Sequence, residues 1–448
     1  MRQILPPKEG IRRLCGEQTE KNSVYRFSAH CVRVPCPEGE LLCNTLTGEL
    51  LLRAHGEDET ALRPELIRRR FLVPQEFDEY GYAEQLRGIL RLTKREKPGL
   101  RSFLIYTTLD CNARCYYCYE LGRARPVMSA DTARRVADFI LQNRGEGEVH
   151  LHWFGGEPLF NRPVIDSISA ALRERNVPFR ASMISNGYLF DEAAVRAARD
   201  DWMLRRVQIT LDGTEEVYNR AKAFIYREGS PYRRVLGNIA RLTEAGIRVT
   251  VRMNLGRDNA EDLLRLCDEL DRGFPDKRNL RAYVALLKDY GHVPMDLGET
   301  EPRLAAFCTL SRRLRELGLS AAAGTIGAMR LNHCYADNDG SIGILPDGRL
   351  TRCEHETENH LVGSIDAPLP KPADYAAWKE RVSVPACRAC PHAPGCTELK
   401  KCPGSGGTCT PLDRAVKDFL LRESILTAYE HENTRDTEDA ESDSAALC

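Results

Sequence analysis

The chain has 448 residues, which is too long for one ordinary hydrophobic core and indicates about two or three domains. Its formal net charge of −1 excludes a global attraction to nucleic acid or to an anionic membrane surface. No long apolar run and no amino-terminal signal pattern is present, which favours a cytoplasmic protein. In that compartment, 17 cysteines point to metal binding rather than to disulfides.

The first part of the chain, residues 1–98, is predicted to be a separate module. Its apolar periodicity indicates strands followed by short amphipathic helices, with a turn that interrupts the second strand. The strands are expected at Tyr25–Val34 and Glu40–Leu52, the turn near Thr47 and Gly48, and the helices at Ala61–Phe71 and Tyr82–Leu92.

A tight cysteine triplet, Cys111, Cys115 and Cys118, follows a short buried strand predicted at 104–107. Three thiolates at this spacing can hold three irons of a [4Fe–4S] cube and leave the fourth iron without a protein ligand. A three-ligand cluster is a reactive arrangement, unlike the closed site of an electron carrier. A C-x-x-C pair in a zinc site or redox motif is the alternative interpretation.

Strand and helix patterns then alternate, which predicts parallel strands joined by crossovers in a full or partial barrel. The strands are expected at 104–107, 149–154, 179–184, 207–211, 247–251 and 280–285, with helices such as 129–144 and 164–172 between them. Each chemically suggestive segment comes directly after a strand, where barrel enzymes place their active sites. These segments are Gly155-Gly156-Glu157-Pro158, Ser185-Asn186, Asp212-Gly213 and Arg252-Met253-Asn254.

A second group of cysteines lies in the carboxy-terminal region. It comprises Cys334, Cys353, Cys387, Cys390, Cys396, Cys402 and Cys409. Without a paired histidine, seven cysteines divide poorly into tetrahedral zinc sites, although a zinc ribbon stays open. A closing helix is predicted at 412–429, and the acidic end, 430–448, is predicted to be disordered.

From residue 102 to residue 285 the chain resembles the radical S-adenosylmethionine (SAM) superfamily. The resemblance implies that Cys111, Cys115 and Cys118 hold a [4Fe–4S] cluster whose open iron chelates SAM, which is then cleaved to a 5′-deoxyadenosyl radical. It also implies a SAM-binding set in which the GGEP motif holds the methionine ammonium, one aromatic ring lies near the adenine, and later residues supply polar contacts. In this set, Arg252 and Asn254 form the pair that would reach the SAM carboxylate. The full set is Gly155, Gly156, Glu157, Tyr117, Ser185, Asn186, Asp212, Arg252 and Asn254.

The carboxy-terminal cysteines resemble the SPASM domain of peptide-maturing relatives, which implies two auxiliary [4Fe–4S] clusters. By position, Cys334, Cys353 and Cys402 would ligate the first, and Cys387, Cys390, Cys396 and Cys409 the second. The interval from Cys396 to Cys402 is longer than in the usual SPASM pattern. The first cluster lacks a fourth ligand, which Cys308 or, by preference, a substrate thiolate would supply.

The predicted fold class is therefore α/β: a partial (β/α)6 TIM-like radical SAM barrel at 99–325. A winged-helix-like peptide-recognition module precedes it at 1–98. A cysteine-rich SPASM domain follows at 326–415, and then a closing helix with a disordered acidic tail at 416–448. The amino-terminal module resembles elements that hold the leader of a precursor peptide, which could bind as an added strand.

The resemblance implies a maturase that installs crosslinks, with thioethers preferred, in a ribosomally made precursor peptide. Its partners would be that peptide with its leader and an electron donor such as flavodoxin or ferredoxin, with no nucleic acid and no membrane. The alternatives are a formylglycine-forming sulfatase maturase, a carbon–carbon crosslinking maturase, an iron–sulfur electron carrier or peptide-binding scaffold, and a zinc-binding adaptor. The pattern does not identify a catalytic acid or base.

Overall fold

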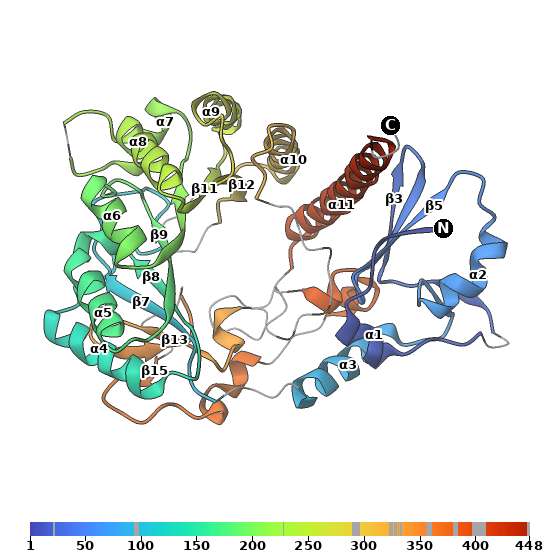
Figure 1. The fold of residues 1–448 in the computed structure, drawn as a ribbon, viewed down its shortest axis with the longest axis horizontal. Coiled ribbons are helices and arrows are strands. Elements are labelled where there is room, and N and C mark those ends of the chain that lie inside the picture. The colour runs from blue at the N-terminus through green and yellow to red at the C-terminus, as the bar shows by residue number, and fades with distance from the viewer. Residues whose placement is uncertain are drawn as a thin grey trace.

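The structure is a computed structural model of the 448-residue chain. It describes residues 1–20, 23–93, 98–226, 228–288, 296–321, 334–354, 361–379, 384–396 and 409–445, together with residues 326, 329 and 331. Figure 1 shows two lobes, a barrel lobe and an amino-terminal lobe, with the long helix α11 lying against the second.

A nine-stranded sheet organises the barrel lobe, in the order β12-β11-β10-β9-β8-β7-β13-β14-β15. The run from β7 to β12 is parallel throughout, and consecutive strands are neighbours, as crossover connections require. This confirms the predicted partial barrel of parallel strands. The strands are β7 Ser102–Thr108, β8 Val149–Gly155, β9 Phe179–Ser185, β10 Leu204–Thr210, β11 Arg248–Leu255 and β12 Leu280–Leu286.

Helices cover the outer side of these strands (Figure 1). Several begin at side chains that accept a hydrogen bond from the first turn, as Ser129 does from the Thr132 amide and Asp191 from the Ala194 amide. The helices are α4 Ala130–Asn143, α5 Arg162–Glu174, α6 Glu192–Asp200, α7 Glu215–Lys222, α8 Pro231–Glu244, α9 Ala260–Gly273 and α10 Thr300–Glu316, with a short 3-10 turn, η1 Pro158–Asn161, before α5.

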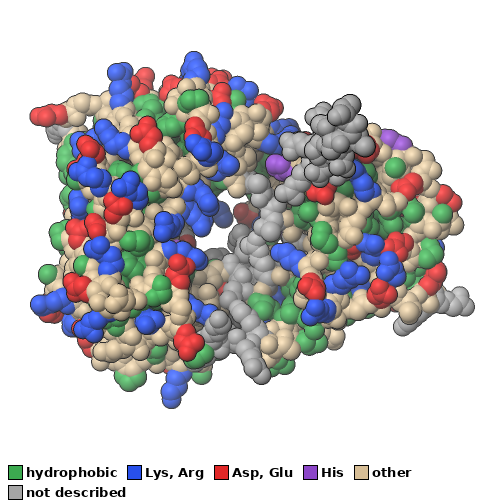
Figure 2. Space-filling model, in the orientation of Figure 1, with side chains coloured by type: hydrophobic (Ala, Val, Ile, Leu, Met, Phe, Trp, Pro, Cys, Tyr) green, Lys and Arg blue, Asp and Glu red, His purple; other side chains and the backbone are tan. Residues whose placement is uncertain are grey.

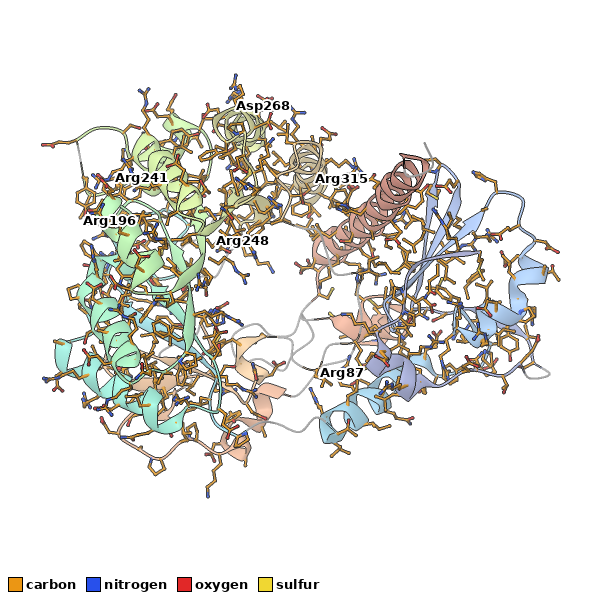
Figure 3. The ribbon with its side chains drawn as sticks, viewed as in Figure 1. Arg87, Arg196, Arg241, Arg248, Asp268 and Arg315 are labelled. Carbon is orange, nitrogen blue, oxygen red and sulfur yellow. The ribbon has the colours of Figure 1, made fainter. Side chains whose placement is uncertain are left out.

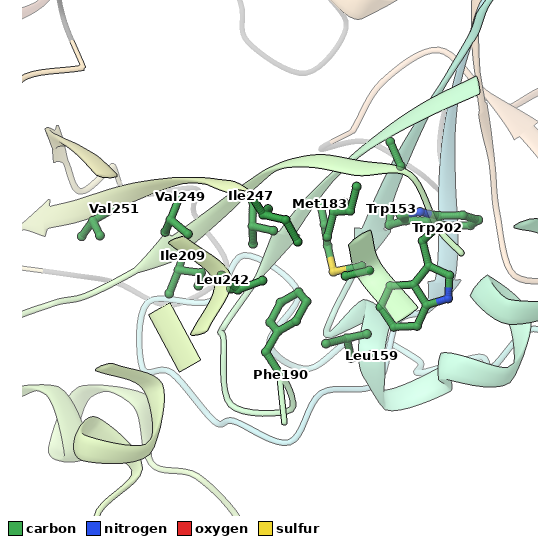
Figure 4. Packing of buried hydrophobic residues seen from close by; sticks show 14 of the residues in the cluster. Trp153, Leu159, Met183, Phe190, Trp202, Ile209, Leu242, Ile247, Val249 and Val251 are labelled. Carbon is green, nitrogen blue, oxygen red and sulfur yellow. The ribbon is translucent and has the colours of Figure 1, made fainter. Parts of the chain in front are cut away.

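The main hydrophobic core lies between the outer face of the sheet and these helices. Alternate strand residues such as Val249 and Val251 point to it, and Trp153 and Trp202 are fully buried there (Figure 4). Because every second strand residue enters this core, the intervening residues lie on the opposite, inner face of the barrel. Side chains that do not enter this core are therefore found at the strand ends and on that inner face.

Three further strands extend the barrel sheet beyond β7, across the predicted domain boundary at residue 325. Strand β13 pairs in parallel with β7, and β14 and β15 follow antiparallel. The segment around Cys334 and Cys353 is thus continuous with the barrel sheet. These elements are η2 Tyr335–Asp337, β13 Ser341–Ile344, β14 Arg349–Thr351, β15 Leu361–Ser364, η3 Pro372–Lys379, η4 Pro385–Ala389 and η5 Ala393–Gly395.

The amino-terminal lobe contains a four-stranded antiparallel sheet in the order β1-β5-β4-β3 and a small β2-β6 pair. The hairpin between β4 and β5 turns near Gly48, as predicted, whereas the strand predicted at 25–34 is divided into β2 and β3. Its elements are β1 Arg2–Leu5, α1 Glu9–Cys15, β2 Tyr25–Phe27, β3 Cys31–Cys36, β4 Gly39–Asn44, β5 Glu49–Ala54, α2 Glu59–Arg68, β6 Leu72–Pro74 and α3 Glu79–Thr93.

The closing helix, α11 Pro411–Ala445, packs on one face of the amino-terminal sheet through Ile425 and Tyr429, while α2 covers the other face. It also contacts α10 and so bridges the two lobes. The helix continues through 430–445, a segment that the sequence predicted to be disordered. Among the described residues, no helix has the length and apolar character needed to cross a membrane.

Candidate functional site

The cysteine triplet lies in the loop that follows β7, and two glycines at the end of β8 pack directly on that loop. The Gly156 amide donates to the Thr108 carbonyl at 3.0 Å, and the Glu157 amide donates to the Asp110 carbonyl at 2.9 Å. A Cβ on Gly155 would lie 2.0 Å from the Thr108 carbonyl oxygen, and one on Gly156 would lie 2.3 Å from that of Asp110. Only glycine therefore allows the two strand ends to approach this closely.

One cleft, open to solvent, collects the three cysteines and part of the predicted SAM-binding set. Asn186 reaches into it from the end of β9, and its Nδ2 lies 3.7 Å from Cys111 Sγ. The Ala113 amide donates to the same sulfur at 3.3 Å. The predicted residues that line the cleft are Cys111, Cys115, Cys118, Gly156, Ser185 and Asn186.

Glu157 does not line the cleft, because its carboxyl group turns into the protein and is fully buried. It accepts hydrogen bonds from the Leu159 amide at 3.1 Å, from Ser185 Oγ at 2.9 Å and from the Asn186 amide at 2.8 Å. Burial raises the pKa of Glu157 to about 7, although these donors lower it. In this geometry the carboxyl group joins the ends of β8 and β9.

A buried lysine that sequence reasoning missed, Lys222 at the end of α7, lines the same cleft. Its Nζ donates to the Tyr117 hydroxyl at 2.8 Å and lies 3.2 Å from Asp212 Oδ2. The Tyr117 hydroxyl in turn donates to Asp212 at 2.6 Å. Burial acts to lower the pKa of Lys222, but the Asp212 carboxylate and the neighbouring Cys115 thiolate raise it above its ordinary value.

The same network continues to β11 and borders a second cleft. Asn254 Nδ2 donates to Asp212 Oδ1 at 2.9 Å, and Arg252 Nε donates to Asn254 Oδ1 at 2.9 Å. Asp212 and Asn254 line this second cleft together with the exposed ring of Tyr116, whereas Arg252 lines neither cleft. Tyr117, the aromatic residue that the sequence placed near the adenine of SAM, has its hydroxyl in this hydrogen-bond network. The ring that lines the second cleft is that of its neighbour, Tyr116.

Burial shifts the pKa values of two ionisable groups in the first cleft. Burial raises the pKa of the Cys111 thiol to about 12, so a thiolate is stable there only next to a positive charge such as iron. Burial also raises the pKa of Glu120, on the rim of the cleft, to about 7, although Arg123 lowers it. Glu120 is thus a carboxyl that titrates near neutrality at the cysteine site.

The first pair of carboxy-terminal cysteines is held together by an arginine. Arg352, fully buried, donates to the carbonyls of Ala336 and Asn338, each at 2.8 Å, and so joins the segment after Cys334 to the residue before Cys353. The guanidinium also lies over the Tyr375 ring, 4.1 Å from its centroid. Cys402, predicted as the third ligand here, lies outside the described residues. Cys308 lies on α10, against the main core.

The remaining cysteines gather between the amino-terminal lobe and α11. Cys387 and Cys396 pack with Tyr80 of α3, and both Cys390 and Cys409 lie within electrostatic reach of Cys396. Arg414 of α11 donates to Cys390 Sγ at 3.0 Å.

From the other side, Arg87 of α3 donates to the Pro394 carbonyl at 2.8 Å (Figure 3). The two helices α3 and α11 thus clasp the segment 387–396. Among the described residues, no three His, Cys, Asp or Glu side chains are arranged to hold a single metal ion. The second auxiliary cluster at Cys387, Cys390, Cys396 and Cys409 therefore stays a prediction.

Comparison with known proteins agrees with this geometry. The sequence profile of the radical SAM superfamily matches residues 105–270. Fe-coproporphyrin III synthase of Methanosarcina barkeri is 24% identical over 253 residues, covering 55% of this chain and 58% of the relative. PqqA peptide cyclase of Gluconobacter oxydans is 29% identical over 182 residues, covering 38% of this chain and 47% of the relative. The chain therefore spans about half of the length of these curated relatives.

Solved structures show the same fold at low sequence identity. anSMEcpe with bound AdoMet and Kp18Cys peptide is 14% identical, with a TM-score of 0.59 over 74% of this chain and 99% of that protein. SuiB of Streptococcus suis is 15% identical, with a TM-score of 0.51 over 86% of this chain and 99% of that protein.

Members of the radical SAM superfamily bind SAM and a [4Fe–4S] cluster, and the observed cleft fits both groups. Three cysteines share one loop, and glycine backbone, Ser185 and Asn186 line the space beside them. The profile match, the parallel-strand fold and this cleft agree on one assignment: residues 105–270 form a radical SAM domain.

Proposed function

We propose that this enzyme modifies a ribosomally made precursor peptide, most simply by forming thioether crosslinks. The observation that carries the proposal is the joint presence of a three-cysteine cleft in the barrel and a second cysteine set held between the amino-terminal module and α11. Likeness in fold to SuiB and to anSMEcpe with a bound peptide supports it.

In this proposal, Cys111, Cys115 and Cys118 would hold a [4Fe–4S] cluster, and residues that line the two clefts would hold SAM. The cluster and SAM together supply a 5′-deoxyadenosyl radical when bound. The chain's own contribution is positional. Gly156, Ser185 and Asn186 line the cleft beside the cysteines, while Tyr116, Asp212 and Asn254 line the second cleft.

Lys222 and Asp212 hold the cysteine loop through their contacts with Tyr117. The Lys222 carbonyl accepts the Arg114 amide at 2.8 Å, and the Lys222 side chain holds the Tyr117 hydroxyl within the same loop. This double attachment fixes the triplet relative to α7. We assign Lys222 as a positioning residue, since its contacts order the cysteines.

Thioether formation replaces one S–H and one C–H bond of the peptide by an S–C bond. One hydrogen atom leaves to the SAM-derived radical, and a proton and a second electron must leave by another route. Cys387, Cys390, Cys396 and Cys409 would hold an auxiliary [4Fe–4S] cluster that accepts this electron, and an external flavodoxin or ferredoxin would exchange it. Cys334, Cys353 and Cys402 would hold the other cluster, with an iron open to the substrate thiolate.

The amino-terminal module would hold the leader of the peptide. Strand β3 is an outer strand of its sheet, so its free edge can pair with an extended peptide. The face of this sheet packs on α11, whose first turns contact Cys390 through Arg414. Helix α11 therefore connects the sheet that would bind the leader to the cysteine-rich segment.

The test is anaerobic incubation with SAM, a chemical reductant and a short peptide encoded beside the gene, followed by mass spectrometry. We expect 5′-deoxyadenosine and a peptide that has lost a pair of hydrogen atoms per link, with fewer alkylatable thiols. The Cys111→Ala variant should produce neither.

Other outcomes separate the alternatives. The same mass loss with all thiols still alkylatable would indicate carbon–carbon coupling, and conversion of a single cysteine or serine to formylglycine would indicate the sulfatase-maturase activity. Absence of 5′-deoxyadenosine from the iron-loaded wild-type protein would refute the proposed chemistry altogether.

A further inference from the structure

The inner face of the barrel carries a row of arginines on adjacent strands. Val207, Val249 and Ala282 enter the hydrophobic core, so the alternate residues of β10, β11 and β12 face inward. We call the inward arginines the inner basic face, and its members are Arg206, Arg248, Arg252 and Arg281. Figure 3 shows Arg248 at the border of the hollow between the two lobes.

No carboxylate within the described part of the chain pairs with these arginines. Arg206 and Arg248 are exposed and form neither a hydrogen bond nor an ion pair there. Arg252 binds the Asn254 side chain, and Arg281 binds the carbonyls of Lys277 and Leu280, which are neutral groups. By contrast, Arg180 on the neighbouring strand β9 pairs with Glu148 at 2.6 Å.

The strand register places two of these charges side by side. Arg206 stands opposite Arg248 in the parallel pairing of β10 and β11, and neighbouring strands lie about 4.8 Å apart. Like charges that face each other across a sheet destabilise it. Their field reaches β8, where burial, Arg180 and Arg206 together lower the pKa of His150 to about 4. Within the part of the chain that the structure describes, the positive charges of Arg206 and Arg248 are therefore not neutralised.

We propose that the inner basic face binds an acidic segment of the substrate peptide, whose carboxylates neutralise Arg206, Arg248 and Arg281. This inference rests on the proposed function, because it names the class of peptide which the enzyme accepts. A peptide held at the β3 edge and reaching the cysteine loop would cross the hollow that this face borders, and basic side chains gather there (Figure 2).

The face suits a peptide better than a nucleic acid. Single-stranded nucleic acid binds on free aromatic rings that stack with bases. The aromatic residues here are held by the protein instead: His152 by Ser102 and Ser182, at 3.0 and 2.8 Å, and Tyr283 by Gln208 at 2.9 Å. Arginine side chains are the long, bidentate donors that carboxylates require.

Fluorescence anisotropy with labelled probe peptides tests the inference. The glutamate probe is a peptide with six glutamates separated by Gly-Ser. Two further peptides carry glutamine or lysine in place of every glutamate, and a six-nucleotide oligothymidylate represents nucleic acid. We expect the glutamate probe to bind at about 50 mM NaCl, to weaken strongly at about 0.5 M, and to bind about tenfold more weakly to Arg206→Gln/Arg248→Gln. The variant Arg206→Glu/Arg248→Glu should prefer the lysine probe instead.

Arg196→Gln/Arg241→Gln is the matched control, because it removes the same charge from the outer helices (Figure 3). It should bind the glutamate probe as the wild type does. Equal affinity of the wild type and Arg206→Gln/Arg248→Gln for this probe, or equally tight binding of the oligothymidylate, would overturn the inference. The wild-type assay for 5′-deoxyadenosine reports separately on the proposed function, since it needs no acidic probe.

Discussion

At the scale of single residues, the buried contact of Lys222 with Asp212 stabilises the cysteine loop. Both side chains are nearly inaccessible, with exposures of 5% and 4%. Removing one partner leaves the other charge buried, which typically costs about 3–5 kcal/mol. We expect Lys222→Met to lower the free energy of unfolding by this amount in urea titrations and to reduce iron binding.

The double variant Lys222→Met/Asp212→Asn should recover part of that loss, since no buried charge is then left alone. Strictly additive effects of the two substitutions would show that the ion pair is not the stabilising contact.

Glu157 gives a pH dependence that can be measured without cofactors. The pKa of its carboxyl is about 7 in the folded protein against an ordinary value of 4.5. The folded chain therefore retains a proton that the unfolded chain releases, so this contribution to stability is complete below about pH 4.5 and is lost as pH rises through about 7. Relative to Glu157→Gln, the wild-type protein should lose about 3 kcal/mol of unfolding free energy between about pH 5 and about pH 8. Parallel pH profiles of the two proteins would contradict this expectation.

At the scale of elements, the close approach of the ends of β7 and β8 depends on Gly155 and Gly156. Gly155 has a φ of +125°, and an added Cβ would clash with the Thr108 carbonyl. Gly155→Ala should separate the two strand ends, with a cost of at least about 1–3 kcal/mol from the backbone conformation alone. Iron and sulfide content after anaerobic reconstitution should fall. Gly237→Ala, on α8, meets only ordinary contacts and should reconstitute fully.

At the scale of the whole molecule, Arg87 attaches the amino-terminal lobe to the cysteine-rich segment. The side chain is 1% exposed and donates to the Pro394 carbonyl. Arg87→Met should weaken this attachment by about 1–3 kcal/mol and increase hydrogen exchange across residues 384–396. Arg91→Met, exposed on the same helix, is the control. Unchanged exchange in the first variant would show that α11 alone holds the segment.

Prediction from sequence succeeded where the signal is local. The strands at 149–154, 179–184 and 280–285 match β8, β9 and β12 closely, because their buried runs are bounded by turn residues. It was less accurate where long-range pairing decides, as in the division of 25–34 into two strands. For the site, spacing and strand ends were sufficient to place Cys111, Ser185 and Asn186 together.

The sequence by itself determined the alternation of strands and helices, the cysteine triplet and the position of polar motifs after strands, since all of these are patterns of neighbouring residues. Only the tertiary structure decided what depends on contacts between distant segments. It placed Lys222 beneath the cysteine loop, turned the Glu157 carboxyl inward, joined β13 to β7 and aligned Arg206 with Arg248. The physical reason is that burial, pKa and charge opposition arise from packing, which no local pattern records.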